Sequence, residues 1–327
     1  MAATHNTKEV VATVTLTNSI KDITKNEWDI CAGVDNPFLS YDFMSSLEDS
    51  GSVGPETGWL PQHLLYRNSS KKLIGIVPLY LKGHSYGEYV FDWGWADAFE
   101  RAGQKYFPKL LSAVPFTPVT CPKLFVCPGE NKEQVHSVLA SGLVSALTQL
   151  KVSSLHVNFS TEGDWNFLGE SSFLKRLGIQ YHWHNDNYAS FEDFLAKLSS
   201  RKRKAIRKER KAAAASGVKI HLLTGEEIKK RHWDAFYQFY VDTSDRKWGS
   251  AYLNREFFDI LGERMADKVL LVMAEYDETL VGGALNFIGT DTLYGRNWGC
   301  LVDFKFLHFE ACYYRAIDFA IERGLSR

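Results

Sequence analysis

Two acid–base candidates lie in the last helix that the sequence predicts. Apolar residues recur at helical spacing from about Phe304 to Arg323, and on a 100° projection they form a stripe of Phe306, Phe309, Tyr313, Ile317 and Ala320. Glu310 falls inside this stripe, where a carboxylate must be paired, hydrogen-bonded or neutral, because burying it ionised and alone is prohibitive. We expect Glu310 to be either a general base or a structural carboxylate that a neighbour satisfies. His308, on the polar side of the helix, is the second candidate base.

The segment just before this helix has residue types that suit an anionic group. Arg296-Asn297-Trp298-Gly299 is predicted to join a strand, Thr292 to Trp298, to the N-terminus of the helix. Free backbone amides and the positive end of the helix dipole point at such a position. We expect these four residues to hold the phosphate or the carbonyl of an activated donor; the alternative is a turn that only serves packing.

Aromatic rings alternate with carboxylates from Phe91 to Arg101. Aromatic clusters usually belong to a core. Three acids among four large rings are difficult to bury, however, so a groove lined by rings and polar groups is an equal alternative. The candidate substrate-binding residues in this segment are Asp92, Trp93, Trp95 and Asp97.

Eight basic residues occupy eleven positions between Arg201 and Lys211. A capping box at Ser190 and a glycine at position 217 delimit one long predicted helix, and every basic residue except Lys202 falls on the half opposite its apolar face. This face, about 35–40 Å long at 1.5 Å per residue, is either solvated or meets the phosphates of RNA, of a nucleotide-linked donor or of a membrane. The candidate phosphate-binding residues are Arg203, Lys204 and Arg207.

The elements that must position these residues are arranged in two similar halves. A length of 327 residues suits two domains of roughly 150 residues each. Each half contains a predicted hairpin followed by a Trp-Gly pair: 63–67 with 73–81 before Trp93-Gly94, and 269–276 with 280–288 before Trp298-Gly299. This order predicts a duplicated α/β unit, with a first domain at 1–186 and a second at 187–327.

The remaining predicted elements alternate in type along the chain. The helices are expected at 24–31, 40–50, 132–150, 165–177, 226–243 and 254–265. The strands are expected at 10–17, 153–159, 179–184 and 218–223.

Composition excludes several classes of protein. The chain is 45% hydrophobic and 24% charged with a net charge of −1, so no global charge attracts nucleic acid or an anionic membrane. No apolar run has the roughly 18 residues of a membrane span and no secretory signal opens the chain, which predicts a cytoplasmic protein, with an organelle such as a plastid left open. Five scattered cysteines favour reduced thiols over a disulfide framework, and no ligand spacing predicts a metal site.

Several blocks of the sequence resemble the FemAB-like branch of the GNAT acyltransferase superfamily, whose members are often described as peptidoglycan biosynthesis or recognition proteins. The matching blocks are Asp92-Trp93-Gly94-Trp95-Ala96, Tyr106-Phe107-Pro108-Lys109-Leu110, Val114-Pro115-Phe116-Thr117-Pro118, Asn36-Pro37-Phe38-Leu39-Ser40, 198–207, Gly282-Gly283-Ala284-Leu285 and 308–314 through Gly324-Leu325. They cover nearly the whole chain. The resemblance implies two tandem GNAT-type units with mixed sheets flanked by helices, an α/β (α+β) fold, and no permanently bound cofactor.

Two departures from the family pattern affect the expectations. Family members continue past the position of Gly324-Leu325, so we expect the second unit to lack its last strands. Arg296 to Gly299 meet only half of the acyl-CoA signature, because Leu301 fills its last place. Both acyl-CoA and aminoacyl-tRNA therefore stay open as the co-substrate.

These observations support two hypotheses from different classes. The first is an N-acyltransferase that moves an acyl or aminoacyl group to the amine of a small molecule or peptide, which requires held reactants, a base and donors for an oxyanion. The second is a non-catalytic protein that binds RNA or a phosphorylated ligand through the basic helix, or an inactive truncated isoform. No pattern indicates an oligomeric state.

Overall fold

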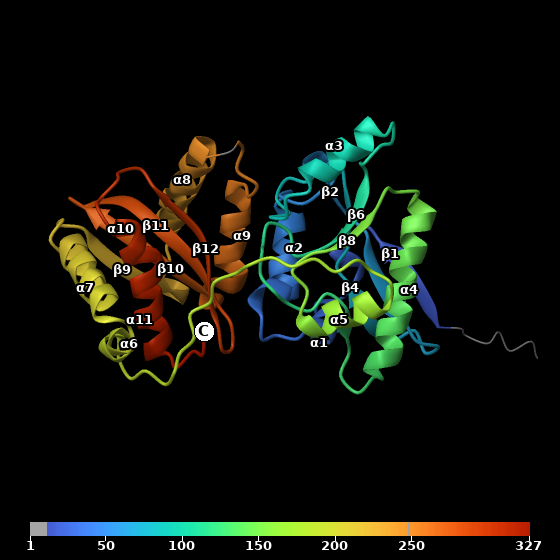
Figure 1. Ribbon diagram of the computed structural model, residues 1–327, viewed down its shortest axis with the longest axis horizontal. Helices are drawn as coiled ribbons and strands as arrows, with labels where there is room; N and C mark the ends of the chain where they lie inside the picture. The colour runs from blue at the N-terminus through green and yellow to red at the C-terminus, as the bar shows by residue number, and fades with distance from the viewer. Residues whose placement is uncertain (1–11, 248) are drawn as a thin grey trace, which may run out of the picture. The chain divides into compact units, whose positions relative to one another are not determined.

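The computed structural model describes residues 12–247 and 249–327, which form two compact units (Figure 1). The first unit takes the chain up to Val34 together with Phe38–Leu177, and the second takes Asp35–Pro37 together with Gly178–Arg327. Both contain sheets flanked by helices, so the expected α/β fold class is confirmed. Among the described residues, no helix is long and apolar enough to cross a bilayer.

The first unit contains two four-stranded sheets. One is antiparallel with the order β1-β3-β4-β7, formed by β1 (Thr13–Thr17), β3 (His63–Arg67), β4 (Leu73–Val77) and β7 (Phe125–Val126). The other has the order β2-β5-β6-β8, formed by β2 (Trp59–Pro61), β5 (Tyr80–Lys82), β6 (Lys109–Ser112) and β8 (Leu155–Val157). Only β6 and β8 run parallel in it, because α4 connects them as a crossover.

Helices cover both faces of the antiparallel sheet in the first unit. The helices of this unit are α1 (Lys25–Ala32), α2 (Tyr41–Asp49), α3 (Trp93–Arg101), α4 (Lys132–Leu150) and α5 (Glu162–Glu170). On β3, His63 contacts Trp28 of α1, whereas Leu64 packs with Leu139 and its neighbours on α4. Burial on both faces explains why β3 and β4 are almost continuously apolar. The hairpin and the 132–150 helix predicted from the sequence are confirmed.

One expectation about the cysteines is wrong. The structure pairs Cys31 of α1 with Cys127, which directly follows β7, in a disulfide with Cα atoms 4.0 Å apart. The two residues are 96 positions apart, and only the packing of α1 against β7 brings them together. Cys121, Cys300 and Cys312 are not part of a disulfide within the described residues.

The second unit contains one antiparallel sheet with the order β12-β11-β10-β9. Its strands are β9 (Lys219–Thr224), β10 (Val269–Tyr276), β11 (Thr279–Ile288) and β12 (Leu293–Cys300). The predicted hairpin at 269–288 is confirmed; its turn residues Asp277 and Glu278 both have positive φ, which is typical of a two-residue hairpin turn. The two Trp-Gly pairs are not equivalent, since Trp93 begins α3 and Trp298 lies in β12.

Helices also cover both faces of this sheet. The helices are α6 (Phe191–Lys197), α7 (Ser200–Ala214), α8 (Lys230–Lys247), α9 (Arg255–Met265), α10 (Leu307–Phe309) and α11 (Arg315–Glu322). The α8 helix packs on β11 and β12 and against α9, whereas α11 packs on the opposite face with α6 and α7 beside it (Figure 1). The apolar residues predicted to share a face on 191–213 do pack together, around Tyr314 and Ile317.

Three predicted elements differ from those observed. The expected helix at 165–177 ends at Glu170, and no strand forms at 179–184, where Ile179 and Tyr181 are 83% and 95% exposed. An apolar pattern without a sheet edge to pair with does not make a strand. The expected single helix from 190 to 217 is broken at Leu198, because the Ser199 side chain caps a new helix by accepting from the Lys202 amide.

The last helix is interrupted by a π-helical turn, Glu310–Tyr314, between α10 and α11. A π turn holds more residues than an α turn, so a 100° projection across it assigns faces wrongly. Phe309 and Tyr313, predicted to lie in the apolar stripe, are 46% and 51% exposed. Gly324 has the expected left-handed conformation, and the residues after it form no strand, although the Arg327 carbonyl accepts a hydrogen bond from the Leu293 amide.

Candidate functional site

The four residues expected at a strand-to-helix turn lie within a strand instead. Arg296, Asn297, Trp298 and Gly299 belong to β12, which pairs with β11 as far as Cys300. The connection to α10 comes later, at 301–306. The expectation of helix N-terminal amides at these residues is therefore wrong, because pairing with β11 extends the strand beyond the predicted end.

A β-bulge at Arg296 changes the register of this strand. Leu285 faces Asn297 and Asn286 faces Gly295, so Arg296 is the extra residue. Bulges are frequent beside active sites, where they redirect side chains. The strand β12 is at the edge of the sheet, so the side of its backbone that faces away from β11 has no neighbouring strand among the described residues.

Trp298 directs its backbone amide toward the outer edge of the sheet. The Leu301 amide donates to the Val281 carbonyl of β11, and amide directions alternate along an antiparallel strand. The amide of Gly299 therefore points at β11, whereas that of Trp298 points away from it. Gly299 is needed for packing: a Cβ atom there would lie 2.2 Å from the Phe239 carbonyl oxygen of α8. Of the two expected donor amides, only Trp298 has the orientation to meet a ligand.

His308 lies beside Trp298, so the structure brings two predicted site residues together. Their ring centroids are 5.5 Å apart, and the rings of Phe309 and Tyr313 lie 5.5 and 5.8 Å from the imidazole. His308 is exposed, as expected for the polar side of its helix. A neutral imidazole next to an outward amide can accept a proton from a bound nucleophile.

Glu310 faces away from this edge, toward α7. Its carboxylate is buried, as predicted, and Oε1 forms ion pairs with Arg210 Nη2 at 3.2 Å and Arg315 Nε at 2.8 Å. Arg210 also pairs with Asp318 at 2.6 Å. Glu310 Oε2 is buried, and none of the described residues donates a hydrogen bond to it. The structural alternative, a carboxylate satisfied by arginines, accounts for most of this geometry.

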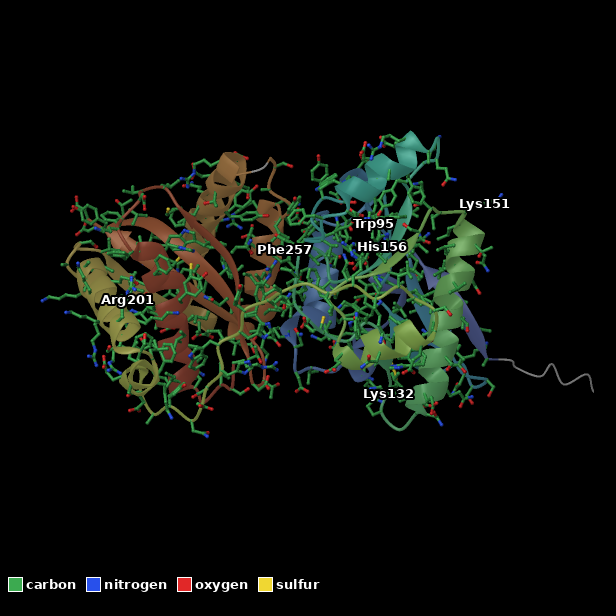
Figure 2. All side chains as sticks on the ribbon, viewed as in Figure 1. Trp95, Lys132, Lys151, His156, Arg201 and Phe257 are labelled. Carbon is green, nitrogen blue, oxygen red and sulfur yellow. A yellow bond between two sulfur atoms is a disulfide. The ribbon has the colours of Figure 1, made fainter. Side chains whose placement is uncertain are left out.

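Two of the three candidate phosphate-binding residues have partners within the second unit. Arg203 Nη1 donates to the carbonyls of Leu195, Ala196 and Leu198 at the C-terminal end of α6. Arg207 Nε donates to Glu192 at 3.2 Å. Lys204 is exposed, as is Arg201 at the start of α7 (Figure 2).

In the first unit, three of the four candidate substrate-binding residues are exposed and the fourth is buried. Trp93 and Trp95 are 46% and 43% exposed, and the exposed Asp97 forms an ion pair with Arg101. Asp92 is buried. The ring centroids of Trp95 and His156, both labelled in Figure 2, are 6.1 Å apart. The Arg176 guanidinium lies 4.4 Å from the centroid of the Trp95 ring. These exposed rings fit a groove better than a core.

Asp92 belongs to a buried polar cluster that sequence reasoning did not identify. Lys109 Nζ donates to Ser85 Oγ and Glu88 Oε2, both at 2.9 Å, and to Asp92 Oδ2. Tyr106 donates to the same Asp92 oxygen at 2.7 Å. Two signals were available in the sequence, since Lys82 and Lys109 each stand in a short apolar strand that is otherwise buried.

The pKa values of this cluster are displaced from their ordinary range. Burial lowers the pKa of Lys82 to about 7, and burial together with the nearby Lys109 charge lowers that of His156 to about 4. Burial raises the pKa of Glu88. Burial opposes ionisation of Asp92 as well, but the hydrogen bonds from Lys109 and Tyr106 outweigh it and lower its pKa. Shifts of this kind mark functional sites more often than inert cores.

The family comparison identifies the class of protein that these two units form. The model of the FemAB-like family, described as peptidoglycan biosynthesis/recognition, matches residues 19–327. The chain belongs to this family. Comparison with curated proteins gives no match.

Solved structures with a similar fold have little sequence in common with the chain. FemX is 11% identical with a TM-score of 0.53, over 93% of this chain and 86% of FemX. The C-terminal domain (DUF2156) of a putative lysylphosphatidylglycerol synthetase from Agrobacterium fabrum is 8% identical with a TM-score of 0.56, over 92% and 76%. L-PGS from Bacillus licheniformis is 10% identical with a TM-score of 0.52, over 89% and 72%. These similarities establish the fold.

Proposed function

We propose that the protein is an N-acyltransferase, which moves an acyl or aminoacyl group from an activated thioester or ester to an amine. The observation that carries the proposal is the outward amide of Trp298 on the edge of β12, with His308 beside it. Membership of the FemAB-like family and the fold shared with FemX support the same reaction class.

The proposed mechanism uses these two groups in complementary roles. The amine nitrogen attacks the donor carbonyl, and the Trp298 N–H donates to the oxygen on which negative charge develops. His308 takes the proton that the nitrogen loses and returns it to the departing thiolate or alkoxide. One C–N bond forms, one C–S or C–O bond breaks, and no redox change occurs.

Glu310, the first base candidate from the sequence, is better suited to a positioning role. To accept a proton it would have to give up its ion pairs with Arg210 and Arg315. The pair with Arg210 joins α7 to the π turn, which begins two residues after His308. We therefore place His308 first as base and Glu310 second.

The co-substrates stay open in two respects. The donor is an acyl-CoA or an aminoacyl-tRNA, and the acceptor is the amine of a small molecule or peptide. Asp92, Trp93, Trp95 and Asp97 were proposed to form an acceptor groove; the exposure of Trp93 and Trp95 supports that role for the rings. Arg296 and Asn297, at and after the bulge, remain proposed contacts of the donor.

Turnover with two classes of donor tests the proposal. The full chain is incubated with labelled acetyl-CoA, or with charged tRNA, and a mixture of primary amines, and new amides are identified by mass spectrometry. We expect His308→Gln to lower the rate by about 100-fold or more and Glu310→Gln to lower it less. His182→Gln, an exposed histidine in the segment between α5 and α6, is the matched control and should leave the rate unchanged.

A second candidate function is binding of RNA without catalysis, favoured by the exposed cations of α7. Lys204 is exposed, and none of the ion pairs among the described residues involves it. Salt-dependent tRNA binding that Lys204→Glu weakens, with no amide formed from either donor, would support this function and contradict the transferase.

A further inference from the structure

Two buried lysines lie directly opposite each other in the first unit. Lys82 of β5 pairs with Lys109 of β6 in an antiparallel register, and Trp59 of β2 pairs with Lys82 on the other side. Lysines are rarely buried, and like charges in facing positions are destabilising. Both side chains are fully buried here. An arrangement that costs stability at two adjacent positions calls for a function.

Lys109 binds two carboxylates but satisfies only one oxygen of each. Lys109 Nζ binds Glu88 Oε2 and Asp92 Oδ2, and each carboxylate is about 1% exposed. Glu88 Oε1 and Asp92 Oδ1 are buried and accept no hydrogen bond from any residue that the structure describes. A buried acceptor without a donor costs free energy comparable to a lost hydrogen bond, more for a charged group. Both oxygens therefore need a partner that carries N–H or O–H groups.

The charge inventory favours a cation as that partner. Within the described part of the chain, Lys109 is the one cation hydrogen-bonded to these two carboxylates. Lys82 donates elsewhere, to the Tyr86 carbonyl at 3.4 Å, and lies 3.7 Å from the centroid of the Trp59 ring. Because its pKa falls to about 7, Lys82 supplies only part of a charge at neutral pH. The cluster then has excess negative charge beside two free acceptors.

Two partly exposed aromatic side chains that are close to these carboxylates in the sequence add a second feature of cation recognition. The rings of Tyr86 and Trp93 lie 5.2 Å apart, and both are about half exposed. Each ring is one or two positions from a carboxylate residue in the sequence. Aromatic faces attract ammonium groups, most strongly when water is excluded.

We propose that the cluster of Glu88, Asp92 and Lys109 is a binding site for an organic primary ammonium, whose N–H groups donate to Glu88 Oε1 and Asp92 Oδ1. Entry of the ligand requires the loop between Lys82 and Trp93 to move, since both carboxylates are covered. The proposal does not depend on acyl transfer, because binding occurs without a donor. If the ammonium does not bind, the proposed acyl transfer still stands. If no acyl transfer is found, the proposed ammonium site still stands.

Calorimetry on the full chain with three small probes tests the ligand class. The probes are n-butylammonium, n-butanol as its neutral analogue, and tetramethylammonium, a cation without N–H groups. We expect saturable binding of n-butylammonium on the order of 1 mM, with the other two at least about 10-fold weaker. Equal binding of butanol, or no saturable binding of butylammonium, would overturn the proposal and assign the free oxygens to water.

Variants locate the site. In Glu88→Gln the amide oxygen can keep Lys109 while the amide nitrogen replaces the free acceptor by a donor, so affinity should fall by at least about 10-fold. Glu100→Gln, the same substitution at an exposed position on the helix that carries Trp93, is the matched control and should bind normally. Lys82→Met removes a competing cation and should tighten binding. Thermal unfolding checks that each variant is folded; a folded Glu88→Gln protein with unchanged affinity would exclude this site.

Discussion

Each unit has a pair of carboxylates that are buried or partly buried, but the cations that partner them differ. In the second unit, Glu310 and Asp318 meet the guanidinium groups of Arg210 and Arg315, which are 23% and 40% exposed at their side chains. In the first unit, Glu88 and Asp92 meet Lys109, which is completely buried. Arginine stays charged under all ordinary conditions, whereas burial lowers the pKa of Lys82, which faces Lys109 across the sheet, to about 7. The arginine cluster is therefore fixed in one state, and the lysine cluster can respond to pH and ligands.

Removing one cation from each cluster should break this comparison most strongly. Lys109→Met leaves two buried carboxylates without their shared cation, which should cost about 3–5 kcal/mol. Arg315→Met removes a partner that is partly solvated and leaves Arg210 in place, so we expect about 1 kcal/mol or less.

Hydrogen exchange measures the stability of each unit separately in these variants, from the protection of the β6 amides in the first unit and the β10 amides in the second. The loss should be confined to the unit that carries the substitution. Equal losses of stability in the two variants would show that the complete burial of Lys109 does not distinguish its cluster from the partly exposed arginine cluster.

The sequence predicted the elements around these clusters better than the clusters themselves. The helix at Lys132–Leu150 and the hairpin of β10 and β11 were correct, because a helical period and a two-residue turn are local signals. The prediction that Glu310 is buried was also correct. Its partner Arg210 lies 100 positions away in the sequence, and no local sequence pattern predicts a contact over such a separation.

The errors arose where tertiary contacts decide the outcome. Pairing with β11 turned the expected anion-binding turn at Arg296–Gly299 into a strand, and the π turn moved Phe309 out of the predicted apolar stripe. The cluster of Lys109 joins residues from a loop, a helix cap and a strand. A lysine in an apolar strand signals such a cluster, but its partners appear only in three dimensions.

The response of the lysine cluster to pH should be visible in the stability of Lys82→Met. The folded-state pKa of Lys82, about 7, lies below its ordinary 10.5. Below pH 7 the ammonium is charged in both folded and unfolded chains, so its burial has the full cost. From pH 7 to 10.5 the unfolded chain binds more protons than the folded one, so wild-type stability rises with pH.

Methionine has a similar shape and no charge, so Lys82→Met should stabilise the protein by roughly 2 kcal/mol near pH 6, with the gain shrinking toward pH 10. Thermal melts at both pH values measure this difference. Lys72→Met, at an exposed ion pair with Glu130, is the control and should show little dependence on pH. A stabilisation by Lys82→Met that grew with pH would contradict a lowered pKa for Lys82 in the folded protein.

The smallest expected effects separate packing from binding on the basic helix of the second unit. Arg203 donates to three carbonyls at the end of α6, so Arg203→Ala should cost about 1 kcal/mol in urea unfolding. Lys204 is exposed, and Lys204→Ala should stay within about 0.5 kcal/mol of wild type. If α7 binds phosphates, the order is opposite in tRNA binding, where Lys204→Ala should reduce the salt dependence more than Arg203→Ala because the Arg203 guanidinium is already engaged. If the same variant had the larger effect on both stability and tRNA binding, Arg203 and Lys204 would not differ in role.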